Sequence, residues 1–180
     1  MKAFTLAAGL LAATSVGADS PVLTVYAPDY FVSEWGPGPQ IETLFEADCA
    51  CDLQFKPGDL LPRLLLEGAR TDADVVIGLN MDVTKRARAS GLFAPHGQDL
   101  GSLTLPLAWT DTVFLPFNYG HTAFVYDTTR LASAPESFDA LLAAPDELRL
   151  VIQDPRSSIS GLALALWVQA VYGDAAVDAW

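Results

Sequence analysis

The segment from Asp154 to Gly161 has residue types that could bind an anion. It follows an apolar run at Leu148–Gln153 and precedes another at Leu162–Tyr172, which predicts a strand, a small-residue turn and a helix start in that order. Such a turn presents free backbone N–H groups and the positive end of a helix dipole, which together favour phosphate or another anion. Arg156 could pair with that anion or bridge to Asp154, and a serine-rich helix start is also a common cap that binds nothing.

Cys49 and Cys51 are the only cysteines, and one residue separates them. An even cysteine count in an exported chain favours a disulfide, although a bridge across one residue closes a small and strained ring. Two free thiols and a soft-metal pair are the alternatives, but a metal site needs further ligands, and His96 and His121 lie far away in sequence. We expect a structural disulfide and assign no chemistry to either cysteine.

Ser158 would be the nucleophile if the chain were a secreted hydrolase. That chemistry requires a Gly-x-Ser-x-Gly turn or a visible partner base. The segment from Arg156 to Ser160 offers neither. We therefore assign no catalytic residue to this segment.

The elements that would position a site alternate in the first half of the chain. β-branched and aromatic runs predict strands, and helices are predicted from i, i+3 and i+4 apolar spacing, from a leucine-rich run and from glycines that end a segment. The predicted strands are Val22–Tyr26, Asp52–Phe55 and Ala73–Gly78, and the predicted helices are Gln40–Ala47, Leu60–Gly68 and Met81–Ser90. Because parallel strands need helical crossovers, this alternation predicts an α/β fold with a parallel sheet.

Ligands of parallel α/β sheets gather at the carboxyl ends of the strands. Those ends are Ala27–Phe31, Pro57–Asp59 and Gly78–Asn80. Later in the chain, Pro116 and Gly120 interrupt an extended apolar run, which indicates a bend or a passage between sheets. Three further elements are expected: a strand at Thr122–Tyr126, a helix capped by Ser137 and running to Leu142, and a strand at Leu148–Gln153.

Residues 1–18 have the pattern of a cleaved signal peptide, with a basic Lys2, an apolar stretch and small residues ending at Ala18. The apolar stretch is too short to span a bilayer, which needs about 20 residues, and no later stretch is expected to span one. The formal net charge is −12 at pH 7, and removal of Lys2 makes it more negative. This charge argues against a nucleic-acid partner and is compatible with a cationic ligand.

Collinear strings along residues 21–180 resemble the periplasmic thiamine-binding proteins, a family of bacterial extracellular solute-binding proteins. The specific strings are Trp35-Gly36-Pro37-Gly38-Pro39 and Asp48-Cys49-Ala50-Cys51. Further matches are Pro21–Tyr26, Ala73–Leu79, Pro116–Gly120, Phe124–Asp127, Gln153–Ser158 and Val171–Asp174. The Asp-Pro-Arg-Ser turn is shared with wider relatives, including ferric-iron binders.

The resemblance implies a type II periplasmic-binding-protein-like fold, in which two α/β lobes joined by hinge strands hold the ligand in the cleft between them. Members are about twice as long as this chain, which would then be an amino-terminal half. The implied divisions are a signal peptide at 1–18, lobe one at 19–117, a hinge crossing at 118–123, and an incomplete start of lobe two at 124–180.

The resemblance also implies the ligand-binding residues. They are Asp29, Tyr30, Trp35, Gly58, Asp59, Tyr119, Ser157, Ser158 and Ile159. Aromatic faces attract the cationic thiazolium of thiamine, carboxylates accept hydrogen bonds from its aminopyrimidine, and helix N-termini hold phosphate. The family commonly has a tyrosine where Pro28 stands, so Tyr30 is the substitute, and the loop before Gly58 is shorter than in the family.

Each of these residues also has a structural alternative. Trp35 could cover the core of its lobe, Asp29 could cap a loop, and Tyr119 could pack at the hinge. The two histidines fit solvated or structural roles, and Trp109 fits a core position.

The resemblance implies the periplasmic component of an ABC importer, which binds thiamine and its phosphates and delivers them to the inner-membrane permease. We expect a monomer that is not an enzyme and has no catalytic residue, no metal and no cofactor. The nearest alternative is a binding protein for ferric iron, a polyamine or another small ion, although iron requires a cluster of tyrosine with carboxylate or histidine. A secreted hydrolase and a purely structural exported domain are the alternatives from other classes.

Overall fold

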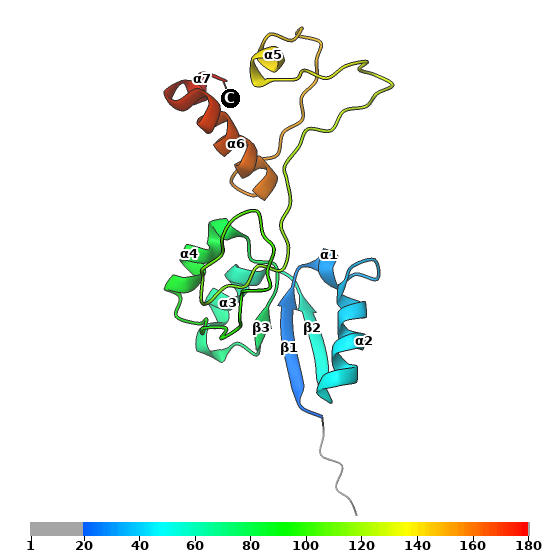
Figure 1. The fold of residues 1–180 in the computed structure, drawn as a ribbon, viewed down its shortest axis with the longest axis vertical. Coiled ribbons are helices and arrows are strands. Elements are labelled where there is room, and N and C mark those ends of the chain that lie inside the picture. The colour runs from blue at the N-terminus through cyan, green and yellow to red at the C-terminus, as the bar shows by residue number, and fades with distance from the viewer. Residues whose placement is uncertain (1–19, 180) are drawn as a thin grey trace, which may run out of the picture. The chain divides into compact units, whose positions relative to one another are not determined.

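A computed structural model describes residues 20–179 of the chain (Figure 1). The chain divides into two compact units between Phe93 and Ala94. The signal peptide expected at 1–18 lies outside the described residues.

The first unit is built on a parallel sheet of β1 (Val22–Ala27), β2 (Asp52–Pro57) and β3 (Val75–Val76) in the order β2-β1-β3. The predicted α/β alternation and parallel sheet are confirmed, with β1 in the centre. β3 is shorter than the predicted strand Ala73–Gly78, because Asp74 binds β1 through its side chain. Its Oδ2 accepts the N–H of Thr24 at 2.9 Å, so a carboxylate takes the place of a backbone acceptor in the ladder.

Helices connect and cover the strands of this sheet. They are α1 (Asp29–Val32), α2 (Gly38–Cys49), α3 (Leu60–Glu67) with the 3-10 turn η1 (Gly68–Arg70), and α4 (Met81–Ala89). α2 lies against β2, and Figure 1 shows α3 and α4 beside β3. The core of the unit combines Val25 and Ala27 of β1 with Leu53 of β2 and Leu61 of α3, all of which are buried.

Tyr26 anchors α3 to the central strand. Its side chain is only 1% exposed, so its hydroxyl group needs a partner, and it donates to Glu67 Oε2 at 3.0 Å. The guanidinium of Arg63 lies 3.9 Å from the centroid of the same ring and donates to Glu67 Oε1 at 2.8 Å. The hydrogen bonds from Arg63 and then Thr71 lower the pKa of Glu67. A buried phenol is thereby satisfied by one ionised carboxylate.

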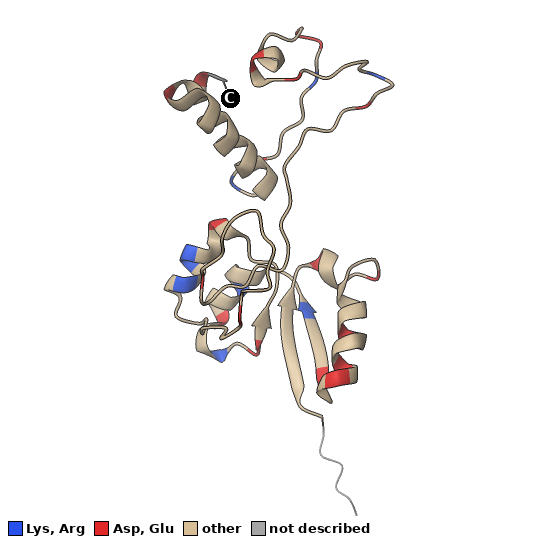
Figure 2. Cartoon of the chain, in the orientation of Figure 1, with Lys and Arg blue, Asp and Glu red and all other residues tan. Residues whose placement is uncertain are grey.

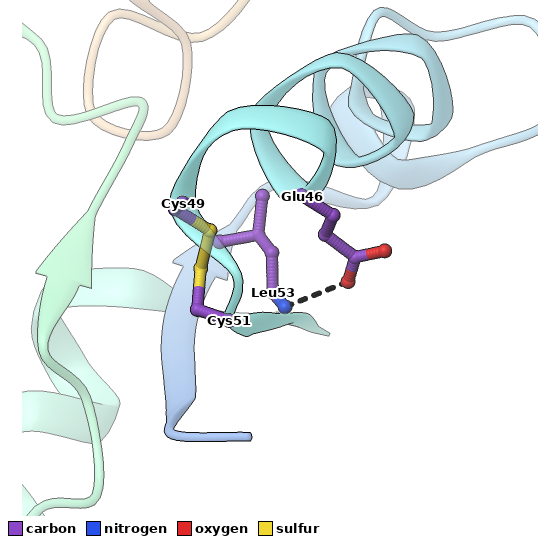
Figure 3. The surroundings of a disulfide bond; sticks show 4 residues. All are labelled: Glu46, Cys49, Cys51 and Leu53. Atoms are coloured by element: carbon purple, nitrogen blue, oxygen red, sulfur yellow. Dashed lines mark hydrogen bonds between the residues drawn. A yellow bond between two sulfur atoms is a disulfide. The ribbon is translucent and has the colours of Figure 1, made fainter.

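A disulfide joins Cys49 and Cys51 at the end of α2 (Figure 3). The intervening Ala50 adopts a left-handed conformation at φ 51°, and the two Cα atoms are 5.2 Å apart. Beside the bridge, Glu46 Oε1 accepts the N–H of Leu53 at 2.8 Å. Of the three alternatives for the cysteines, the structure has the disulfide. It joins the last residue of α2 to the residue before β2.

The second unit contains α5 (Phe138–Leu142), α6 (Ile159–Tyr172), the 3-10 turn η2 (Gly173–Ala175) and α7 (Ala176–Ala179). The two predicted helices are confirmed, and Ser137 caps α5 by accepting the Ala140 N–H at 3.0 Å. The strands predicted at Thr122–Tyr126 and Leu148–Gln153 are wrong. A strand exists only where a neighbour supplies ladder partners, and within residues 94–179 neither segment pairs with a strand.

An aromatic cluster organises the second unit. Phe138 packs edge-on against Trp167, with ring centroids 5.0 Å apart, and also contacts Phe124 and Tyr172. Tyr172 donates to Asp139 Oδ1 at 2.6 Å, and this hydrogen bond raises the pKa of the phenol. Large apolar side chains around the cluster remain exposed, namely Val125, Leu150, Val151, Leu166, Val171 and Val177.

The run Ile159–Asp178 is long and apolar enough, by length and composition, to cross a membrane, which the sequence did not lead us to expect. It is the single such run within residues 20–179. It is composed of α6, η2 and α7, and Gly173 between them has a φ of 57°. The run is therefore not one regular α-helix.

We predict that Leu64→Ala lowers the free energy of unfolding of the first unit by about 2 to 5 kcal/mol, because it leaves a cavity in the core. Leu64 is 2% exposed, whereas Leu66 on the same helix is 83% exposed. Leu66→Ala should change the free energy by less than about 0.5 kcal/mol. Urea unfolding followed by circular dichroism measures both, and equal losses would contradict the predicted core.

Candidate functional site

The carboxyl ends of three parallel strands form one edge of the first unit. Ala27 of β1 pairs with Pro57 of β2, and Tyr26 pairs with Val76 of β3. The segments that follow the strands therefore leave the sheet beside one another, at the arrowheads in Figure 1. This edge carries Asp29, Tyr30, Gly58 and Asp59 of the predicted site, in two of the three segments.

In α1, Asp29 and Tyr30 face the solvent, and Phe31 packs against the sheet. The Phe31 side chain is buried, with its ring centroid 5.7 Å from that of Phe55 in β2. Tyr30 is 68% exposed, and Asp29 is exposed in the first turn. One buried ring thus holds a short helix on the sheet while the neighbouring phenol faces outward.

The loop after α1 is held by glycines and exposes Trp35. A Cβ at Gly36 would collide with the carbonyl oxygens of Tyr30 and Phe31, and one at Gly38 would lie 2.7 Å from the same Phe31 oxygen. Only glycine allows the loop to pack so closely on α1. The Trp35 side chain is 89% exposed, so the alternative that it covers the lobe core is wrong in this unit.

Two polar residues at the edge start helices without capping them. Asp59 is the N-cap of α3 and Asn80 is the N-cap of α4, and neither side chain makes a capping hydrogen bond. Both are exposed. An N-cap side chain normally accepts a backbone N–H of the first turn, so these two keep their acceptors for other partners. The sequence predicted that Asn80 follows the third strand, but Asn80 was not among the predicted ligand-binding residues.

Gly78 lies where the three segments meet. It follows Ile77, whose N–H donates to the Tyr26 carbonyl at 2.8 Å, and it has a φ of 101°. A Cβ at this position would lie 2.6 Å from Cγ of Pro28 and 3.3 Å from Cδ1 of Leu60. The segment after β3 therefore touches those after β1 and β2. No sequence pattern predicted this contact.

The carboxylates and aromatic rings at this edge suit a ligand that contains a positively charged aromatic ring. Asp29 and Asp59 supply carboxylates, and Tyr30 and Trp35 supply exposed rings. Figure 2 shows acidic positions at the start of α1 and the end of α2, and basic positions together on α4. Within residues 20–179, no group of three or more His, Cys, Asp or Glu side chains is placed to hold a metal ion.

The remaining predicted residues belong to the second unit. Tyr119 is exposed, and its ring lies edge-on to that of His121 at 6.0 Å. Ser158 caps α6, since its Oγ accepts the Gly161 N–H, and it donates to the side-chain oxygen of Gln153. Ile159, the first residue of α6, is exposed.

In the turn before α6, some of the hydrogen-bond donors are already bonded to acceptors of the same turn. The N–H groups of Ser157 and Ser158 donate to the Asp154 carbonyl at 3.1 and 2.9 Å. Arg156 binds the Asp154 carboxylate through Nε at 3.0 Å and Nη2 at 2.6 Å. Of the two roles considered for Arg156, the structure has the bridge to Asp154. These contacts bring the predicted anion-binding residues together in one turn.

The second unit also contains two hollows, of about 300 and 1140 Å³. Apolar side chains of the aromatic cluster and of Leu141 and Leu148 line both. None of the nine predicted site residues lines either hollow. Five of the predicted residues therefore belong to the first unit and four to the second.

We predict that the Asp154 carboxyl titrates below 3.8, because hydrogen bonds from the Arg156 side chain and backbone lower its pKa. The stability that this pair adds is present above 3.8 and is lost as the pH falls through the lowered pKa. Arg156→Ala should raise the pKa only part of the way, since the backbone N–H still donates. An NMR titration of the carboxyl carbon measures this, with Arg130→Ala as the control; an unchanged pKa in Arg156→Ala would contradict it.

No protein-family model matches the chain. The thiamine-binding periplasmic protein of Brucella abortus is 44% identical to it, over 88% of this chain and 48% of that protein. The protein of the same name from Escherichia coli is 43% identical, over 95% of this chain and 54% of its own. The one from Haemophilus influenzae is 39% identical, over 100% and 56%. The chain thus spans about half the length of the curated relatives it matches.

The fold agrees with the sequence comparison. A solved structure of a periplasmic thiamin binding protein superposes with a TM-score of 0.80 and 44% identity, over 89% of this chain and 52% of that one. The predicted periplasmic-binding-protein-like α/β fold is therefore confirmed. By sequence and by fold, this chain is a relative of the periplasmic thiamine-binding proteins, similar to them over most of its own length and about half of theirs.

Proposed function

We propose that this chain carries the thiamine-binding face of the periplasmic solute-binding component of an ABC importer. The observation that carries the proposal is the edge of the first unit, where two exposed aromatic rings, Tyr30 and Trp35, accompany the carboxylates of Asp29 and Asp59. Relatives named thiamine-binding periplasmic proteins, 39 to 44% identical to this chain, support it.

The chemistry of thiamine fits the side chains at this edge. The thiazolium ring is a cation, and an aromatic face attracts a cation by about 2 kcal/mol when the contact is desolvated. The aminopyrimidine donates hydrogen bonds, which the carboxylates of Asp29 and Asp59 accept. Gly58, with a φ of 132° and open space where a Cβ would be, lets a ligand approach the backbone beside Asp59.

The second unit contributes a place for phosphate in this proposal. Ser157, Ser158 and Ile159 form the start of the 14-residue helix α6, where the helix dipole favours an anion. Arg156 is occupied by Asp154, so we assign the phosphate to the helix start and not to the guanidinium. Tyr119, from the proposed hinge crossing at 118–123, adds a further ring.

The proposed protein is a monomer without a cofactor that captures its ligand between two lobes, closes around it and delivers it to the inner-membrane permease. Lobe one would cover 19–117, and lobe two would begin at 124. Closure is stabilised only by ligand contacts with both lobes. We therefore assign the complete binding site to a chain of the relatives' length.

We predict that a protein of the relatives' full length binds thiamine and that the 180-residue chain binds it weakly or not at all. Isothermal calorimetry and tryptophan fluorescence measure the binding of thiamine, its monophosphate and its diphosphate to each. Ferric iron and a polyamine serve as comparison ligands. Binding of one of these by the full-length protein, without thiamine binding, would overturn the proposed function.

We predict that Trp35→Ala in the full-length protein weakens thiamine binding about tenfold or more, because the cation loses an aromatic face. Trp35→Phe should keep part of the affinity, since it retains a smaller ring. Leu66→Ala, which removes a similarly exposed apolar side chain from α3, should leave the dissociation constant unchanged. Equal affinity of Trp35→Ala and the wild type would exclude Trp35 from the site.

A further inference from the structure

We infer that Gly78 is a positioning residue, which sets the two carboxylate-bearing segments of the binding edge relative to one another. This inference rests on the proposed function, because it concerns the same site. Gly78 itself is not proposed to contact the ligand. It acts through Pro28 and Leu60, each of which is the immediate neighbour of a predicted ligand residue, Asp29 and Asp59 respectively.

The distances leave no space for a side chain at Gly78. A Cβ would lie 2.6 Å from Cγ and 2.9 Å from Cδ of Pro28, closer than non-bonded carbon atoms approach. The proline ring cannot rotate away, since its Cδ is bonded to the backbone nitrogen. Relief requires a shift of the backbone at Pro28 or at position 78, and we infer that Pro28 moves and takes α1 with it.

The shift would reach the site directly. Pro28 is the N-cap of α1, and its carbonyl accepts the N–H of Phe31 at 2.9 Å. Displacement of Pro28 therefore moves Asp29 and Tyr30 as one piece. The contact of 3.3 Å with Leu60 Cδ1 is milder, and a flexible leucine side chain absorbs it more easily.

A second glycine, Gly91, separates the effect of the collision with Pro28 from the effect of backbone strain. Gly78 and Gly91 both have positive φ values, 101° and 70°, so alanine is strained at either position. At Gly91 nothing lies within 4 Å of an added Cβ. Gly91→Ala in the same unit is therefore the matched control for strain without collision.

The first test needs no ligand. In the 180-residue chain, Gly78→Ala should shift the backbone amide NMR signals of Asp29 and Tyr30, whereas Gly91→Ala should leave them in place. Pro28→Ala, which removes the Cγ and Cδ atoms, should return the signals of the double variant to those of Pro28→Ala alone. Signals unmoved in Gly78→Ala, or moved equally in Gly91→Ala, would overturn the inference.

The second test uses thiamine titration of the full-length protein. We expect Gly78→Ala to weaken binding about tenfold, Gly91→Ala to leave it within about threefold, and Pro28→Ala to restore binding in the double variant. A merely structural role would lower the urea midpoint without rescue of affinity by Pro28→Ala. If the wild type itself does not bind thiamine, the proposed function fails, while the amide shifts still test the positioning contact.

Discussion

The parallel pairing of β1 with both of its neighbours is the constraint on which the proposed binding edge depends. Because β1 lies in the centre, the segments after β1, β2 and β3 all leave the sheet at one edge. Their side chains come from positions far apart in sequence. The helices cover the sheet and return the chain, but the strand order decides which residues become neighbours. An antiparallel partner for β1 would remove one of the three segments from this edge.

Much of the first unit could be predicted from sequence because local patterns determine it. Apolar residues at i, i+3 and i+4 located α2, a leucine-rich run located α3, and β-branched runs located β1 and β3. The length of β3 could not be predicted, since it depends on the Asp74 carboxylate accepting a hydrogen bond from Thr24 across the sheet. The contact of Gly78 with Pro28 depends on the same long-range arrangement, and a glycine at a strand end gives no signal of what it touches.

The second unit shows where local patterns are insufficient. Thr122–Tyr126 and Leu148–Gln153 have β-forming residues, but a strand is a property of a pair. Helices need no such partner, because their hydrogen bonds are internal, and α5 and α6 lie where the sequence predicts them. The site residues were predicted from the resemblance. For Arg156 and for the serine-rich helix start, the sequence left open a ligand contact and a local role, and only the structure shows the local hydrogen bonds.

The loop from Ser33 to Pro39 contains glycines that pack against α1 and a tryptophan that faces the solvent. Gly36 and Gly38 are confined by the carbonyl oxygens of α1, so their identities are dictated by the frame. Trp35 contributes almost nothing to burial. A substitution at position 35 therefore costs little stability, so the proposed ligand contact of this loop can change while the fold is kept.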